Sequence, residues 1–301
     1  MFADMEGLTP RQKTNQKDDE IAKKPNNEFK DERIDTSKAK WHVNMQMAYT
    51  MAIGLRFLLL SSDEDKSLTN RVELATPLNS FRRLTEGVTL WRDHQIDPYS
   101  GVIFHETPLT LHFFAMLPSR FVPYLFVMID VLAALLIGRL ASAMASHYIK
   151  EQERQQPERH EDAADLSLKE EEVNEMEKRA QLAYLFHPYL VANCAAKTTT
   201  TISNLVLAAF LLATVKKKRN IACLLLALAT YQSFYPVMLI FPLCICLAQE
   251  YVSTASPYRI VRNVVVPTVL TFLLSFAALN LISYHLMEGS WNFLGATHGF
   301  I

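Results

Sequence analysis

The sequence carries almost no net charge, because 30 basic residues among its 301 balance 31 acidic ones. Proteins that bind nucleic acid present a basic face or stripe to the phosphate backbone. A formal charge of −1 therefore gives no electrostatic reason to expect a nucleic-acid partner.

Cysteine is also scarce, and its spacing fits neither a zinc site nor the disulfide framework of a secreted protein. A cysteine nucleophile needs a nearby histidine in a polar cleft, and no local motif suggests one. We expect small buried hydrophobic residues, because all four lie in or beside apolar runs: Cys194, Cys223, Cys244 and Cys246.

Apolar residues make up 50% of the chain and are concentrated in long runs. A helix needs roughly 20 apolar residues to cross a bilayer, and several runs lack the polar face of an amphipathic helix. The runs predict an all-α integral membrane protein, a multi-spanning helical bundle. They are Tyr49–Leu60, Phe121–Ser146, Ile202–Val215, Ile221–Gln249 (broken at TYQSFYP) and Val264–Leu286.

The charged residues divide the chain into regions. Residues 1–44 are polar and are expected to form a disordered tail, whereas residues 45–301 form the membrane domain. Four consecutive basic residues, Lys216 to Arg219, mark a cytosolic loop by the positive-inside rule. Counting spans from there places the acidic loop 147–180 in the cytosol and the segment 61–107 on the luminal side.

The stretch HETPLTLH resembles a metalloprotease motif but departs from its spacing. Such motifs place two histidines one helical turn apart, whereas His112 follows His105 by seven positions. Pro108 belongs in the first turn of a helix, with Thr107 as the N-cap, so His105 lies before the helix. No third ligand is near, and we expect no metal and no other cofactor.

Several sequence blocks resemble one known family. RVELATPLNSFRRLTEGVTLW, DPYSGVIFHETPLTLHFF, MIDVLAALLIG, HPYLVANCAAKTTTTISN and LLLALATYQSFYPVMLIFP occur in that order, and together they resemble the U subunit (PIG-U) family of glycosylphosphatidylinositol (GPI) transamidase. The resemblance covers about residues 55–301. It implies a multi-pass protein of the endoplasmic reticulum membrane, with a fold similar to GT-C glycosyltransferases.

The resemblance also implies a role in GPI-anchor attachment. Such a protein is a non-catalytic subunit that helps bind or present the GPI lipid, while a separate cysteine-protease-like subunit joins the lipid to the C-terminus of precursor proteins. Family members begin with a more apolar first span and continue after the block SWNFLGATHGFI. We therefore expect a chain that is incomplete at its C-terminus, with residues 1–40 an extension or a gene-prediction artefact.

A GPI-pathway mannosyltransferase that uses a dolichol-phosphate sugar is the alternative. Its chemistry needs an acidic residue, usually in an Asp-x-Asp-like pair, in the first luminal loop. LTNRVELATP offers Asn70 and Glu73 but no acidic pair. Glu73, Glu86 or Glu106 could each serve as a base, but the missing pair favours the non-catalytic subunit, and we assign no catalytic residue.

Polar groups at three bends are the candidates for contact with the GPI lipid. Lys197 could pair with a phosphate, and tyrosines favour the headgroup level. Asp130, inside a span, is instead expected to be protonated or hydrogen-bonded and to join helices. The lipid-binding candidates are Tyr99, His105, Glu106, Lys197, Asn204, Tyr231, Gln232 and Tyr235.

Overall fold

The computed structural model describes residues 44–299 with the exception of 63, 102, 156–166 and 252–255. The predicted tail 1–44 lies outside the described residues except for its last residue, Asn44. The Asn44 side chain accepts hydrogen bonds from the backbone N–H groups of Gln46 and Met47, at 3.1 and 3.4 Å. This cap starts the first described helix, because it satisfies N–H groups that have no partner inside a helix.

The described residues form helices and no strands, which confirms the predicted all-α fold for this part of the chain. The α-helices are α2 (Met45–Ser61), α3 (Glu64–Thr69), α4 (Phe81–Arg92), α5 (Pro108–Met116), α6 (Val122–Gln155), α7 (Glu170–Leu185), α8 (Pro188–Ala195), α9 (Thr200–Val215), α10 (Arg219–Gln232), α11 (Ile240–Ala248), α12 (Pro257–Ile260), α13 (Val266–Leu286) and α14 (Asn292–His298). Short 3-10 turns are η2 (Pro98–Ser100), η3 (Ser119–Phe121), η6 (Tyr235–Leu239) and η7 (Gln249–Tyr251), and η8 (Val261–Val265) is a π-helical turn.

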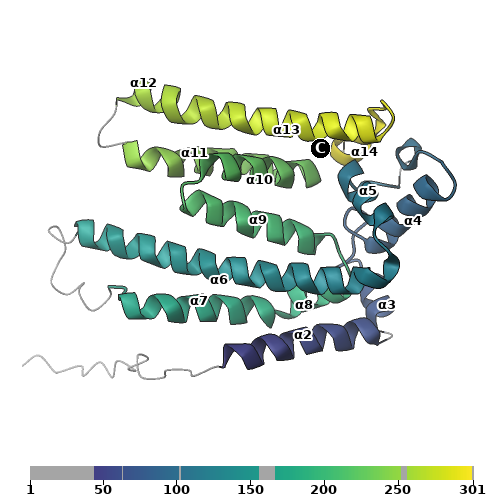
Figure 1. Ribbon diagram of the computed structural model, residues 1–301, viewed down its shortest axis with the longest axis horizontal. Helices are drawn as coiled ribbons and strands as arrows, with labels where there is room; N and C mark the ends of the chain where they lie inside the picture. Colours follow the sequence, from purple (N-terminus) through teal and green to yellow (C-terminus); the bar gives the residue numbers. More distant parts are fainter. Residues whose placement is uncertain (1–43, 63, 102, 156–166, 252–255, 300–301) are drawn as a thin grey trace, which may run out of the picture. The chain divides into compact units, whose positions relative to one another are not determined.

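The long helices pack side by side (Figure 1). Helix α6 lies between α7 and α9, and α10 lies between α9 and α13. Helices α4, α5 and α14 gather at one end of these helices, which we call the α5 end. The turn Lys216–Lys218 and helix α12 lie at the other end, which we call the α12 end.

Within the part of the chain that the structure describes, two continuous helical stretches are long and apolar enough to cross a membrane, judged by length and composition. They are Ser119–Arg154 with 36 residues and Pro257–Leu286 with 30. Shorter apolar helices occupy Met45–Ser61, Thr200–Val215 and Tyr235–Ala248. Each predicted run is therefore helical. These helices fit an integral membrane protein, while the number of spans stays a prediction.

The predicted break at TYQSFYP is confirmed. Helix α10 ends at Gln232, Ser233 takes an extended conformation, and Pro236 lies in the first turn of η6. Pro267 causes a second irregularity, because it has no N–H to donate inside the continuous helix 257–286. The π-helical turn η8 ends two residues before Pro267, and its wider turn accommodates the missing N–H donor.

The described parts of the acidic segment 147–180 are largely helical, in line with the expectation of a solvated, partly helical loop. Helix α6 continues to Gln155, since Glu, Gln and Arg are good helix formers. Helix α7 begins at Glu170, and three glutamates in its first turn favour the positive end of the helix dipole. Residues 156–166 of the predicted loop lie outside the described residues.

A buried ion pair joins three helices. Arg56 of α2 and Asp130 of α6 are 0% and 1% exposed, and their side chains meet at 2.5 Å. The Tyr184 hydroxyl of α7 donates to the second carboxylate oxygen at 3.1 Å, and Arg56 also donates to the Ala52 carbonyl at 3.0 Å. The prediction that Asp130 joins helices is confirmed.

Candidate functional site

A cavity of about 1000 Å³ lies at the α5 end. Its walls come from five separate segments: residues 76–79 with Arg83, the stretch 103–110 before and into α5, the start of α9 (199–207), the end of α10 (229–236), and Thr297 and His298. The described lining mixes hydroxyl, amide, imidazole, carboxyl and guanidinium groups with apolar side chains. Such a lining suits an amphiphilic ligand with a polar head.

Glu106 is the acidic residue among the described cavity-lining residues. Its Oε1 accepts a hydrogen bond of 2.7 Å from the Thr199 hydroxyl at the start of α9. Burial raises the pKa of the Glu106 carboxyl to about 7, and the bond from Thr199 opposes that shift because it favours the ionised form. Near neutral pH this carboxyl can accept a hydrogen bond, donate one, or exchange a proton.

The backbone of Glu106 is fixed by the preceding turn. Asp97 accepts a bond from the Tyr99 backbone N–H at 2.9 Å, which shapes η2. The Tyr99 phenol is buried and donates to the Glu106 carbonyl at 2.8 Å. Because burial raises the pKa of Tyr99 well above its ordinary value, the phenol keeps its proton for this bond. Tyr99 therefore positions Glu106 and does not itself line the cavity.

A second set of bonds holds the segment 76–79 against the start of α9. The Thr199 backbone N–H donates to the Asn79 carbonyl at 3.0 Å, and the Asn79 amide donates to the Thr200 hydroxyl at 2.8 Å. Asn79 also accepts a bond of 2.7 Å from the Thr76 backbone N–H. The wall that carries Thr199 is thus fixed by contacts across 120 residues of sequence.

Two histidines border the cavity. His105 Nδ1 lies 2.9 Å from the Ala296 carbonyl; a carbonyl only accepts, so Nδ1 carries the proton. His298 has both ring nitrogens buried without a hydrogen-bond partner in the described structure, and it lies against Phe234 and Phe276. Burial lowers the pKa of His298, which leaves its imidazole neutral at pH 7.

The end of α10 supplies the remaining polar wall. Gln232 lines the cavity, and its side-chain oxygen accepts a bond of 3.1 Å from the Ser203 hydroxyl of α9. Asn204 and Tyr235 line it as well, and Tyr235 is 73% exposed. The structure therefore brings five predicted residues together, namely His105, Glu106, Asn204, Gln232 and Tyr235.

Lys197 and Tyr231 lie apart from this cavity. Lys197 takes a left-handed conformation with φ 55° in the turn between α8 and α9. The Tyr231 phenol is buried, contacts the Ser283 hydroxyl, and accepts a bond of 3.3 Å from the Leu109 backbone N–H. Tyr231 therefore joins α5, α10 and α13 from inside the protein.

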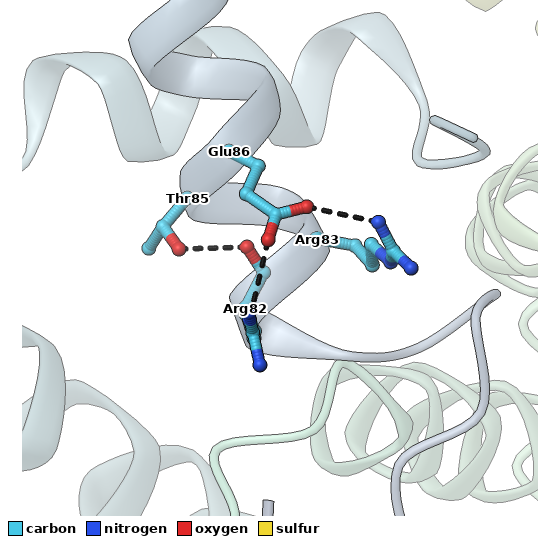
Figure 2. A network of polar contacts seen from close by, with 4 residues as sticks. All are labelled: Arg82, Arg83, Thr85 and Glu86. Atoms are coloured by element: carbon cyan, nitrogen blue, oxygen red, sulfur yellow. Dashed lines mark hydrogen bonds and ion pairs between the residues drawn. The ribbon is translucent and has the colours of Figure 1, made fainter. Parts of the chain in front are cut away.

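Glu86 and Glu73 do not line the cavity. Figure 2 shows the Glu86 carboxylate between two arginines of its own helix, with Arg82 Nε at 3.2 Å and Arg83 Nη1 at 3.0 Å. The Thr85 hydroxyl donates to the Arg82 carbonyl beside them. The side chain of Glu73 is exposed. Of the three predicted base candidates, Glu106 is the one in contact with the cavity.

Sequence reasoning missed Thr199, Arg83 and His298 as cavity residues. Thr199 lies in the CAAKTTTTISN block, where its neighbour Thr198 was the threonine expected to contact the lipid, because nothing in four consecutive threonines marks the one that faces the cavity. Arg83 reaches the cavity from the amphipathic helix α4, and its position in the sequence carries no sign of a ligand. Among the described residues, no three His, Cys, Asp or Glu side chains gather in a way that could hold a metal.

Comparison with known proteins gives consistent matches. The family model described as GPI transamidase subunit PIG-U matches residues 50–301. The chain is 30% identical over 258 residues to the human protein named GPI-anchor transamidase component PIGU, and 30% identical over 260 residues to its mouse counterpart. It is 24% identical over 258 residues to the Saccharomyces cerevisiae protein named GPI transamidase component GAB1.

Each of these alignments covers 85% of this chain. They cover 59% of the human and mouse proteins and 55% of the yeast protein. The chain therefore spans somewhat more than half the length of the relatives that it matches.

Proposed function

Because the chain belongs to the GPI transamidase subunit PIG-U family, we propose that it is a non-catalytic subunit of the GPI transamidase complex. In this role it binds or presents the GPI lipid, which a cysteine-protease-like subunit attaches to the C-terminus of precursor proteins. The observation that carries the proposal is the cavity at the α5 end, whose lining combines hydrogen-bonding and charged side chains with apolar surface. Its volume of about 1000 Å³ is large enough for part of a glycolipid head.

The cavity lining suggests how the lipid head is held. Sugar hydroxyls both donate and accept hydrogen bonds, and Asn204, Gln232 and Glu106 offer both kinds of partner. Arg83 uses one nitrogen for Glu86, so its other N–H groups remain for a phosphate oxygen. Apolar cavity residues such as Leu207 provide surface for the less polar part of the lipid.

The membrane arrangement is part of the same proposal. We place the α5 end on the luminal side and the α12 end, with Lys216 to Arg219, in the cytosol. The chain is then a multi-pass protein of the endoplasmic reticulum membrane with a fold related to GT-C glycosyltransferases. The cavity faces the compartment in which the other transamidase subunits meet the precursor protein.

A mannosyltransferase would use the same cavity differently. Glu106, with a pKa of about 7, has the proton affinity that a general base needs near neutral pH. The family assignment favours the transamidase subunit, and no second carboxylate is among the described lining residues. When Glu106 is replaced, the two functions predict that different glycolipids accumulate in the cell.

The test uses cells that lack their own copy of this subunit and express the chain with Glu106→Gln or Thr199→Val. We expect several-fold less GPI-anchored protein at the cell surface, measured by flow cytometry, and unchanged co-precipitation of the cysteine-protease-like subunit. The matched control is Glu73→Gln, which removes an exposed acid outside the cavity and leaves the surface signal unchanged.

Glycolipid analysis of the same cells separates the two functions. Accumulation of complete GPI supports the transamidase subunit, since the lipid is made but not transferred. Accumulation of GPI precursors that lack a mannose would instead establish the mannosyltransferase. Normal surface protein in well-expressed Glu106→Gln and Thr199→Val cells would remove the cavity from the proposed function.

A further inference from the structure

A second pocket, of about 490 Å³, lies at the α12 end. Four elements line it: the turn into α10 with Lys217, Lys218 and Arg219, the end of α11, the 3-10 turn η7, and the π-helical turn η8. Its other polar lining residues are Asn220, Asn263 and Tyr251. No acidic side chain is among the described residues that line this pocket, so its charge is positive.

The three basic residues have different roles in this pocket. Lys217 has φ 55°, and its Nζ donates to the Cys246 carbonyl near the end of α11. This bond closes the pocket between the α9–α10 turn and α11, and Lys217 is therefore a structural residue. Lys218 is exposed and makes no ion pair among the described residues, so it is available to an anion.

Arg219 is the second available cation. Its Nε makes one long contact of 3.4 Å with the Asn220 side chain, which leaves the other guanidinium N–H groups for a ligand. Helix α10 begins at Arg219 without a side-chain cap or an acidic residue in its first turn. Two cations and the positive end of a 14-residue helix dipole therefore face one pocket.

Apolar surface adjoins the charged part of the pocket. Ile221 lines the pocket and is 48% exposed, while Leu224 of the same helix and Ile245 of α11 are 52% and 57% exposed. A free phosphate would use only the basic residues. A phospholipid would place its phosphate against Lys218 and Arg219 and its acyl chains along the exposed apolar faces of α10 and α11.

We propose that this pocket is a binding site for the phosphate of an anionic phospholipid at the membrane surface of the α12 end. Basic pockets between membrane helices bind acidic headgroups in this way. The site is separate from the cavity of the proposed function, since the 16 residues of α9 lie between the two. A helix of that length spans roughly 24 Å, so the two sites can be tested separately, although the placement of the α12 end at a membrane surface rests on the membrane arrangement of the proposed function.

The experiment measures lipid binding to the purified full chain in detergent by native mass spectrometry. The lipids are phosphatidylserine, phosphatidylinositol and phosphatidylcholine. We expect the anionic lipids to bind about tenfold more tightly than phosphatidylcholine, and Lys218→Gln/Arg219→Gln to remove most of that preference. The single variant Lys218→Gln changes only an exposed side chain and should lose part of the preference for anionic lipids. It therefore tests the proposal even if the double variant does not fold.

The matched control removes the same charge outside the pocket. Arg259 and Arg262 are exposed and lie on α12 and η8, at the same end, but do not line the pocket. Arg259→Gln/Arg262→Gln should keep the preference for anionic lipids. Equal losses in both double variants would show general electrostatic attraction and overturn the proposal.

Two further outcomes also decide against the proposal. The first is that the native chain binds all three lipids equally. The second is that millimolar inorganic phosphate displaces the anionic lipids completely, which would show that the pocket takes free phosphate and that the apolar surface adds nothing.

Discussion

The ion pair between Arg56 and Asp130 can be removed by replacing either residue, and because both side chains are buried each replacement should lower the free energy of unfolding. Asp130→Leu leaves the guanidinium of Arg56 buried without its counter-ion, although it still donates to the Ala52 carbonyl. Removing one partner of a buried pair typically costs about 3–5 kcal/mol, because the other charge loses its compensation. We expect Arg56→Met to destabilise the protein by a similar amount, since Asp130 then keeps only the bond from Tyr184.

The double variant Arg56→Met/Asp130→Leu should cost less than either single variant. Apolar side chains of similar size often replace a buried ion pair without loss, or with a gain of roughly 1–4 kcal/mol. Tyr184→Phe should cost about 1.5–3 kcal/mol, as expected for the loss of one hydrogen bond to a charged group. The four proteins therefore form a double-mutant cycle that isolates the ion pair, with Tyr184→Phe as a separate probe.

The assay is the midpoint of thermal unfolding in detergent, followed by the loss of the monodisperse peak in size-exclusion chromatography. At about 2–4 °C per kcal/mol, each single variant should unfold at least roughly 6 °C lower. Met47→Leu, on an exposed part of α2, is the control and should leave the midpoint unchanged. Additive losses in the double variant would refute the reasoning, because they would mean that the two charges do not depend on one another.

Two further predictions concern the α5 end. The pKa of Glu106 is raised from its ordinary value of 4.5 to about 7, so its contribution to stability is fully present below pH 4.5 and is lost as the pH rises through 7. Glu106→Gln should therefore unfold at a higher temperature than the native chain at pH 8 and at about the same temperature at pH 4. Equal pH profiles would contradict the raised pKa. A Cβ at Gly87 would lie 2.2 Å from the ring of Phe104, whereas one at Gly54 meets nothing within 4 Å; Gly87→Ala should therefore lower the unfolding midpoint, and Gly54→Ala should raise it by the helix preference of alanine, about 0.5–1 kcal/mol. A rise in the midpoint with Gly87→Ala would show that Phe104 moves aside freely.

The helices could be predicted because their signals are local. The apolar run Val264–Leu286 nearly matches α13, and Thr107 and Pro108 mark the start of α5. The side chain of Thr107 nonetheless bonds the Thr110 hydroxyl at 2.9 Å and caps no backbone N–H. The charged stretch after the apolar run was expected to be partly helical, and α6 continues into it as far as Gln155 because its residues favour helix.

The site could be predicted only in part, because it depends on distant contacts. Glu106 was selected for its position next to His105, yet its partner Thr199 lies 93 residues away. Asp130 was identified as a joining residue, but its partner Arg56, at a separation of 74 residues, was seen only as a charge within an apolar run. No local pattern connects such pairs, since they meet only when the helices pack.

The contact between Leu109 and Tyr231 has a consequence for the order in which the protein matures. The first turn of α5 is completed by a phenol that follows 122 residues later in the chain, and that phenol contacts Ser283, a further 52 residues on. A ribosome adds about 5–20 residues per second, so α5 waits roughly 6–25 seconds for Tyr231 to be made. During that interval the stretch that carries Glu106 lacks this anchor, and the cavity takes its final form only after α10 and α13 have been synthesised and packed against α5.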